Sequence, residues 1–298
     1  MLISTSTGIC TSVLHRTEKH FTCEEALAQI ARAGFQAVDL CFVAYGRPGM
    51  PMSAPDWRTW VHRQKELAET LGLETNQGHA HYYPAAESYR YTQEDWQAAE
   101  ALIRRDIEAA GICAIPWLVI HPDSHLKDGN YSRRLSLQKE YERFSRLGDL
   151  AARWNVGIAI ENMIAGSSAG RFGCTYEDLM DLLNLLKDDE RFGICWDTGH
   201  ANLNQSDQPS AIRAMGKRLR CLHVNDNYCR GSDDHTLPFL GTIAWEPIMK
   251  ALKESGYQGD FTYEIHRFTE GFSPQLHPQA LQFARLTAEH LLTMMNDI

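Results

Sequence analysis

Short apolar runs alternate with amphipathic segments along the whole of this chain. The apolar runs predict strands, which are expected at residues 2–9, 37–42, 73–79, 117–121, 157–161, 192–197, 219–224 and 260–265. Apolar positions that recur every three or four residues predict helices, which are expected at residues 23–33, 54–71, 93–110, 133–154, 176–187, 208–216, 245–255 and 278–295. Strands that alternate with helices form a parallel sheet, and eight such repeats predict an α/β fold that closes into a (β/α)8 barrel.

The alternative arrangement of the same elements is an open, doubly wound sheet. That fold usually carries a G-x-G-x-x-G turn after a strand, and the sequence has none in that position. Several predicted helices open with a hydroxyl residue followed three positions later by an acid, as in a capping box; these pairs are Thr22 with Glu25, Ser53 with Asp56, Thr92 with Asp95 and Thr175 with Asp178. We therefore expect a single TIM barrel domain over residues 1–298.

Side chains that can bind a metal end one predicted strand after another. The residues in these positions are His79, His121, Glu161, Asp197, His223 and Glu264. In a barrel the carboxyl ends of all strands surround the same mouth, so these side chains are expected to converge there. Loop lengths indicate a binding site at the same end of the barrel, because strand-to-helix connections are long and helix-to-strand connections are short. Long loops on one face usually bind a ligand.

Glu161, Asp197, His223 and Glu264 come from consecutive predicted strands. Three carboxylates and one imidazole make a hard, mostly oxygen site, which suits Mn²⁺, Mg²⁺ or Co²⁺ and is also compatible with Zn²⁺. For each residue alone, the alternative is a hydrogen bond to a loop amide. The four together predict a divalent metal site.

Other polar residues near the same end are candidates for substrate binding or for further metal ions. They are His79, His121, His200, Asp233 and His235. A hydrogen bond that orients a metal ligand is the alternative role for His200, and a solvated loop is the alternative for Asp233 and His235. Trp117 is a candidate for an apolar wall against a sugar, although core packing is the commoner role of an isolated aromatic residue.

Composition limits the classes of partner. A formal net charge of −9 argues against a general binder of nucleic acid, although bound metal ions would add positive charge that this count omits.

The eight cysteines form no C-x-x-C pair, and a disulfide framework is not expected in a chain of 298 residues, so we expect a reducing, cytoplasmic location. No signal-peptide pattern opens the sequence, and its longest apolar stretch, residues 112–120, is too short to span a bilayer.

Several segments resemble a known family. They are Ile160-Glu161-Asn162, Trp196-Asp197-Thr198-Gly199-His200-Ala201-Asn202, Leu222-His223-Val224-Asn225-Asp226 and Gly256-Tyr257-Gln258-Gly259-Asp260-Phe261-Thr262-Tyr263-Glu264-Ile265. The chain resembles the xylose isomerase-like barrel superfamily, in particular its sugar phosphate isomerase/epimerase branch, which includes ketose 3-epimerases, hydroxypyruvate isomerase and inosose dehydratase. The resemblance implies that Glu161, Asp197, His223 and Glu264 bind the metal and that His200 lies at the substrate.

The same superfamily contains the endonuclease IV group of abasic-site nucleases, which use three zinc ions. The resemblance implies counterparts for all of their ligands: His79, His121, Glu161, Asp197, His200, His223, Asp233, His235 and Glu264. The sequence departs from that group at its opening strand and at Ile265-His266, where a threonine-proline turn is expected. It departs from ketose epimerases at Cys229, where an arginine that contacts substrate is expected. The adjacent Arg230 is the candidate for that substrate contact.

These features predict a metal-dependent sugar or polyol-ketone isomerase or epimerase that acts through an enediolate, with Glu161 and Glu264 as the groups that remove and return the proton. Epimerisation, aldose–ketose isomerisation and dehydration of a polyol ketone all begin with this step and remain open. The rival predictions are a zinc-dependent phosphodiesterase of the endonuclease IV kind and a barrel that binds a sugar without turnover. The expected partner is a small sugar or polyol, nucleic acid and membrane are not expected, and a homo-oligomer is possible.

Overall fold

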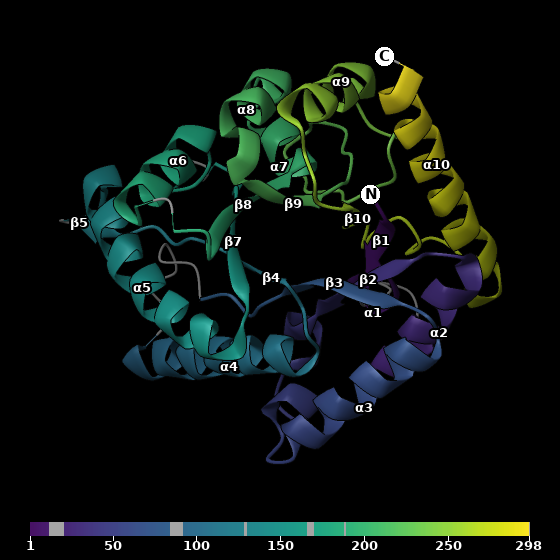
Figure 1. Cartoon of the computed structure of the whole chain (residues 1–298), viewed down its shortest axis with the longest axis horizontal. Coiled ribbons are helices and arrows are strands. Elements are labelled where there is room, and N and C mark those ends of the chain that lie inside the picture. The colour runs from purple at the N-terminus through teal and green to yellow at the C-terminus, as the bar shows by residue number, and fades with distance from the viewer. Residues whose placement is uncertain (12–20, 84–91, 128–129, 166–169, 188, 298) are drawn as a thin grey trace.

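The structure is a computed structural model that describes residues 1–11, 21–83, 92–127, 130–165, 170–187 and 189–297. Eight parallel strands form its centre (Figure 1). They are β1 Ile3–Ser6, β2 Ala37–Cys41, β3 Glu74–His79, β4 Trp117–Ile120, β7 Gly157–Glu161, β8 Phe192–Asp197, β9 Leu219–His223 and β10 Phe261–Tyr263. The strand order is β10-β1-β2-β3-β4-β7-β8-β9. The ring closes between β9 and β10, because Val224 N donates to Thr262 O at 2.8 Å and Glu264 N donates to Val224 O at 3.1 Å. The predicted (β/α)8 barrel is confirmed.

Helices cover the outside of this ring (Figure 1). The longer ones are α2 Cys23–Ala33, α3 Trp57–Thr70, α4 Gln93–Ile112, α5 Arg133–Trp154, α6 Tyr176–Leu185, α8 Gln208–Met215, α9 Trp245–Ser255 and α10 His277–Asp297. Shorter elements lie at the strand and helix ends: α1 Gly8–Thr11, α7 Thr198–Leu203, the 3-10 turns η1 Phe42–Tyr45, η2 Pro51–Ser53, η3 Gly216–Arg218 and η4 Pro274–Leu276, and the hairpin of β5 Leu126–Lys127 with β6 Asn130–Tyr131. No helix in the described ranges is both long and apolar enough to cross a bilayer.

Local sequence explains where several helices begin. Thr22 and Thr92 each form a complete capping box with the acid three residues on, and the Thr175 side chain accepts from Asp178 N. The predicted cap at Ser53 is wrong. Ser53 lies in η2 and its hydroxyl donates to Gly46 O, while α3 begins after Asp56 without a side-chain cap.

The barrel core has two apolar layers. One fills the space between strands and helices, where Leu27, Ile103 and Phe144 are fully buried. The other lies within the ring, where Val119, Ala159, Cys195 and Cys221 form a cluster with Trp117 packed against it. This inner cluster fills the barrel below its mouth, so the polar residues at the strand ends rest on a close-packed support.

Candidate metal and substrate site

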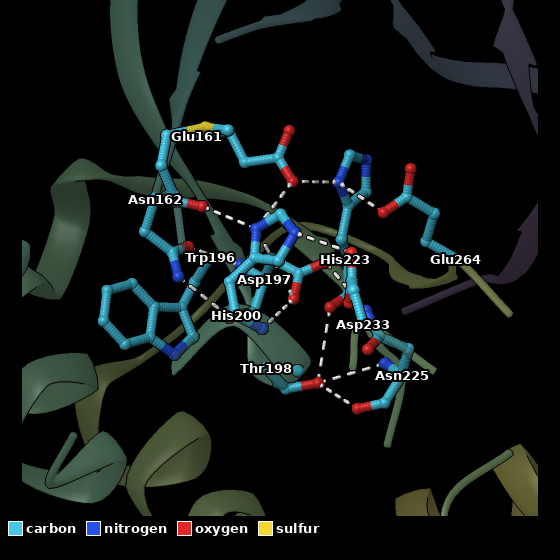
Figure 2. Close-up of polar contacts among 12 residues, drawn as sticks. Glu161, Asn162, Trp196, Asp197, Thr198, His200, His223, Asn225, Asp233 and Glu264 are labelled. Carbon is cyan, nitrogen blue, oxygen red and sulfur yellow. Dashed lines mark hydrogen bonds and ion pairs between the residues drawn. The ribbon is translucent and has the colours of Figure 1, made fainter. Parts of the chain in front are cut away.

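The strand register places the expected metal ligands side by side. Glu161 ends β7, Asp197 ends β8 and His223 ends β9, and Asp197 pairs directly with His223 in the sheet. Glu264 follows β10, on the other side of His223. One ligand atom from each of these residues lies within 4.8 Å of the others, and all four residues are buried (Figure 2). The structure therefore brings the predicted set around one centre.

His223 lies between the two glutamates of this set. Its Nδ1 is 2.9 Å from Glu161 Oε1 and 3.4 Å from Glu264 Oε2 (Figure 2). Its Nε2 points to Asp39 in β2, at 3.6 Å from Oδ2. A carboxylate behind a metal-binding histidine fixes the ring orientation and raises the basicity of the free nitrogen. Sequence analysis missed Asp39, although an acid inside the apolar run of residues 37–41 was a signal for it.

Asp197 is fixed by hydrogen bonds to its side chain as well as to its backbone. Oδ1 accepts from His200 N at 2.6 Å, where Asp197 caps α7, and Oδ2 accepts from Asn225 Nδ2 at 2.7 Å. The amide of Asn162 bonds both the N–H and the C=O of Asp197. Asn162 and Asn225 were present in the family-like segments, but their sequence positions gave no indication of this bonding.

A second group of candidate ligands shares Glu161. His121 Nε2 lies 2.9 Å from Glu161 Oε2, and His79 Nε2 lies 3.4 Å from the same oxygen. The two histidine Nε2 atoms are 3.2 Å apart. His79 Nδ1 contacts Ala80 O at 2.8 Å, so Nε2 is the nitrogen that faces the centre. Among the residues described, this trio also meets the spacing for a metal ion.

A third group lies on the other side of Asp197. Asp233 Oδ2 is 2.7 Å from His235 Nε2 and 3.4 Å from His200 Nε2. His200 Nδ1 contacts Asn162 O at 2.8 Å, which leaves Nε2 to face Asp233. The alternative of a solvated loop does not describe Asp233 and His235, since both side chains are only partly exposed and are paired with each other.

His266 is a further member of the site that sequence analysis did not assign. Its Nε2 lies 3.1 Å from Glu264 Oε1, and its ring centroid is 5.1 Å from that of His235. Gly8 leaves space for this ring, because a Cβ on Gly8 would lie 2.3 Å from His266 Cε1. The signal was the E-x-H spacing from Glu264, at the point where the sequence departs from the nuclease pattern.

The ionisable side chains of this site shift one another's pKa values. Burial opposes ionisation of Glu161, but His223 and His121 outweigh it and lower the Glu161 pKa well below its ordinary value. For Glu264, His223 and His266 likewise outweigh burial and lower the pKa. Burial raises the pKa of Asp197 to about 7, with His200 opposing the shift. Nearby histidines and carboxylates therefore set each other's charge.

The donor set fits a hard divalent cation. Within the described residues, the ion pairs of Glu161, Asp197 and Glu264 are all with histidines rather than with lysine or arginine. Three buried carboxylates at this spacing are costly unless positive charge compensates them. A divalent ion supplies that charge, and oxygen donors with one imidazole suit Mn²⁺, Mg²⁺, Co²⁺ or Zn²⁺.

A cavity of about 980 Å³ opens above these residues, and His79, His121, Glu161, His200, Asp233 and Glu264 all line it. Trp117 does not reach it. As the first residue of β4, Trp117 lies at the opposite end of the barrel beside Arg220, whose guanidinium is 5.3 Å from its ring. The expectation of a substrate contact at Trp117 is corrected accordingly, because only the carboxyl ends of parallel strands meet at the mouth.

Arg230 is exposed, with its guanidinium 6.0 Å from the Tyr228 ring, and it is not among the described residues that line the cavity. Arg230 therefore lies outside the cavity in which a substrate contact was expected.

Comparison with known proteins agrees with this fold. The family described as xylose isomerase-like TIM barrel matches residues 27–287. An uncharacterized protein of Sinorhizobium fredii is 27% identical over 228 residues, which cover 74% of this chain and 71% of that protein. A probable endonuclease 4 of Cenarchaeum symbiosum is 29% identical over 168 residues, which cover 52% of this chain and only 58% of that protein.

Among solved structures, a D-tagatose 3-epimerase-like protein superimposes with a TM-score of 0.74 at 20% identity, covering 100% of this chain and 99% of the other. At this identity the likeness establishes the fold alone.

Proposed function

This chain belongs to the xylose isomerase-like TIM barrel family, and from the geometry of its site we propose that it is a divalent-metal-dependent sugar isomerase or epimerase. The observation that carries the proposal is the pair of buried glutamates, Glu161 and Glu264, which flank His223 at 2.9 and 3.4 Å. Two carboxylates on either side of His223 can act on opposite faces of a bound substrate. The likeness in fold to a D-tagatose 3-epimerase-like protein supports the same reaction class.

Glu161, Asp197, His223 and Glu264 would hold the metal. A divalent cation in this site would polarise a substrate carbonyl and stabilise negative charge on its oxygen. Asp39 lies 3.6 Å behind His223 Nε2, and hydrogen bonds from Asn162 and Asn225 fix Asp197, so Asp197 is held before substrate binds.

Proton transfer is assigned to the two glutamates. One carboxylate removes the proton from the carbon next to the carbonyl, and the other takes up a proton from solvent and donates it to the enediolate. Return to the opposite face of the same carbon gives an epimer, and return to the neighbouring carbon gives an isomer. If the second glutamate instead donates its proton to a β-hydroxyl, which leaves as water, the same enediolate gives dehydration, so the three outcomes share one set of residues.

A solvent-deuterium screen tests this function. The protein loaded with Mn²⁺ or Co²⁺ is incubated in deuterium oxide with ketoses, inososes and their phosphates, and deuterium at the carbon next to the carbonyl is measured by NMR. Exchange in at least one substrate, lost on chelation, is the expected result. Absence of exchange across the panel would leave a barrel that binds its ligand without turnover.

A second candidate function is metal-dependent hydrolysis of a phosphodiester. It is favoured by the three adjoining ligand groups around Glu161, Asp197 and Asp233, which have the spacing for more than one ion. The formal net charge of −9 opposes binding of a nucleic-acid backbone. Metal analysis and an abasic-site duplex separate the two functions. Three tightly bound zinc ions together with strand cleavage would replace the isomerase proposal.

A further inference from the structure

The cavity above the site has two chemically different parts. Its floor consists of the acids and histidines at the strand ends. Its sides include a set of apolar residues that we call the apolar wall, Val43, Met50, Trp60, Tyr82, Tyr83 and Ile164, and the charged residues Arg47 and Arg171 line it as well. These residues come from the segments after β2, β3 and β7 and from α3, so the wall surrounds the floor on several sides.

The size of the cavity exceeds the needs of a free sugar. A monosaccharide of about a dozen heavy atoms takes on the order of 200 Å³, at a little over half the volume of a liquid water per atom. The cavity holds about 980 Å³, near the upper end of the range for drug-sized ligands. Within the described part of the chain, a free ketose on the floor would leave the apolar wall in contact with water, which is unfavourable for so much apolar surface.

Tyr82 joins the two parts of the cavity. Its ring stacks on His121 with centroids 5.5 Å apart and planes 9° apart, while its side chain remains 54% exposed. Tyr83 next to it is held in place, because its ring lies 4.9 Å from Trp96 and the Arg143 guanidinium is 4.7 Å from its centroid. A ligand whose polar end reaches Glu161 therefore passes an aromatic surface that is already positioned.

We infer that the substrate is a keto sugar or polyol ketone that carries an aromatic or comparable apolar substituent, as an aryl glycoside does. The inference rests on the proposed function and adds the class of substrate. The polar ring lies on the floor, where hydroxyl and carbonyl oxygens meet the acids and histidines. The substituent packs against the apolar wall, where burial of its ring is favourable.

Calorimetric binding to the metal-loaded protein tests the inference with two keto-sugar probes that differ only in the substituent, the methyl and phenyl β-glycosides of 3-keto-D-glucose. The phenyl probe is expected to bind at least about tenfold more tightly, since an aromatic ring buries on the order of 100 Å² of apolar surface. Equal affinity, or binding of neither probe, would overturn the inference.

Two variants of the apolar wall test whether the preference for the phenyl probe arises there. Tyr82→Ala and Ile164→Ala are each expected to reduce the phenyl preference severalfold, and two separate positions guard against an indirect effect of Tyr82 on His121. Leu286→Ala is the matched control, because Leu286 is an apolar residue of α10 that is 51% exposed and does not line the cavity. A preference that survives both wall variants would also overturn the inference.

The deuterium screen distinguishes an error in the inferred substrate class from an error in the proposed reaction. If free ketoses exchange but the phenyl probe has no advantage, the substrate class is wrong and the isomerase proposal stands. If the phenyl probe binds more tightly but no keto compound exchanges, the proposed reaction is wrong. The phenyl keto-sugar probe is added to the screen for this purpose, and if sugar phosphates exchange faster than it does, a phosphorylated substrate replaces the one inferred.

Discussion

Asn162 holds Asp197 through both atoms of its side-chain amide. Asn162 Oδ1 accepts from Asp197 N at 2.6 Å, and Asn162 Nδ2 donates to Asp197 O at 2.9 Å (Figure 2). This clamp ties the residue after Glu161 to the end of the neighbouring strand. One side chain thus fixes the candidate metal ligands at the ends of β7 and β8 relative to one another. Their positions are therefore set by the backbone of two paired strands.

Replacement of Gly199 is expected to disturb this arrangement. A Cβ at Gly199 would lie 1.8 Å from Asn225 Oδ1, so the Asn225 side chain must move from its hydrogen bond to Asp197. We expect Gly199→Ala to weaken metal binding by about 10–100-fold, the usual effect of losing a residue that supports a ligand. Gly271→Ala is the control, because nothing lies within 4 Å of a Cβ there. Equal metal affinity of the two variants in a competitive titration would contradict this prediction.

The glutamate pair provides the most direct test of the reaction. Glu161→Gln and Glu264→Gln keep the side-chain shape but remove the group that exchanges a proton. Deuterium incorporation is expected to fall by about 10²–10⁴-fold in each variant. Metal content measured on the same samples distinguishes loss of the base from loss of the ion. Glu177→Gln, at an exposed position in α6, is the control and should retain activity. Substantial exchange by either active-site variant would remove that residue from the mechanism.

Removal of metal is expected to destabilise the barrel. Glu161, Asp197 and Glu264 are buried close together, and without a cation their negative charges are balanced only in part by histidines. At saturating Mn²⁺ the bound ion should raise Tm by about 5–15 °C relative to protein treated with chelator. Differential scanning fluorimetry before and after re-addition of Mn²⁺ measures the shift. An unchanged Tm would mean that these residues do not form a metal site in solution.

His266 is expected to act through Glu264. Burial raises the Glu264 pKa, but His223 and His266 together lower it, so His266→Ala should raise the pKa of this carboxyl. Because the ionised carboxylate acts as the base, the acid limb of the pH–kcat profile should move to higher pH. His266→Gln can still donate to Glu264 Oε1 and should shift the limb less. A fall in rate with no movement of the limb would indicate a structural role alone.

The order and number of the barrel elements could be read from the sequence. Strand identity depends on local apolar runs, and helix starts at Thr22, Thr92 and Thr175 depend on caps that involve only the next three residues. These interactions are short-range and leave a direct pattern in the chain. Ser53 was mistaken for a cap because its hydroxyl bonds to Gly46 in the preceding loop, a choice that local sequence does not encode.

The sequence by itself therefore determined the fold and the types of residue at the strand ends, because strand periodicity and chain direction decide which side chains reach the mouth of a barrel. Only the tertiary structure decided their partners and distances. The contacts of Asp39 with His223 and of His200 with Asp233 join residues that are distant in the chain. Register is fixed by packing of the whole ring, and no local pattern carries that information.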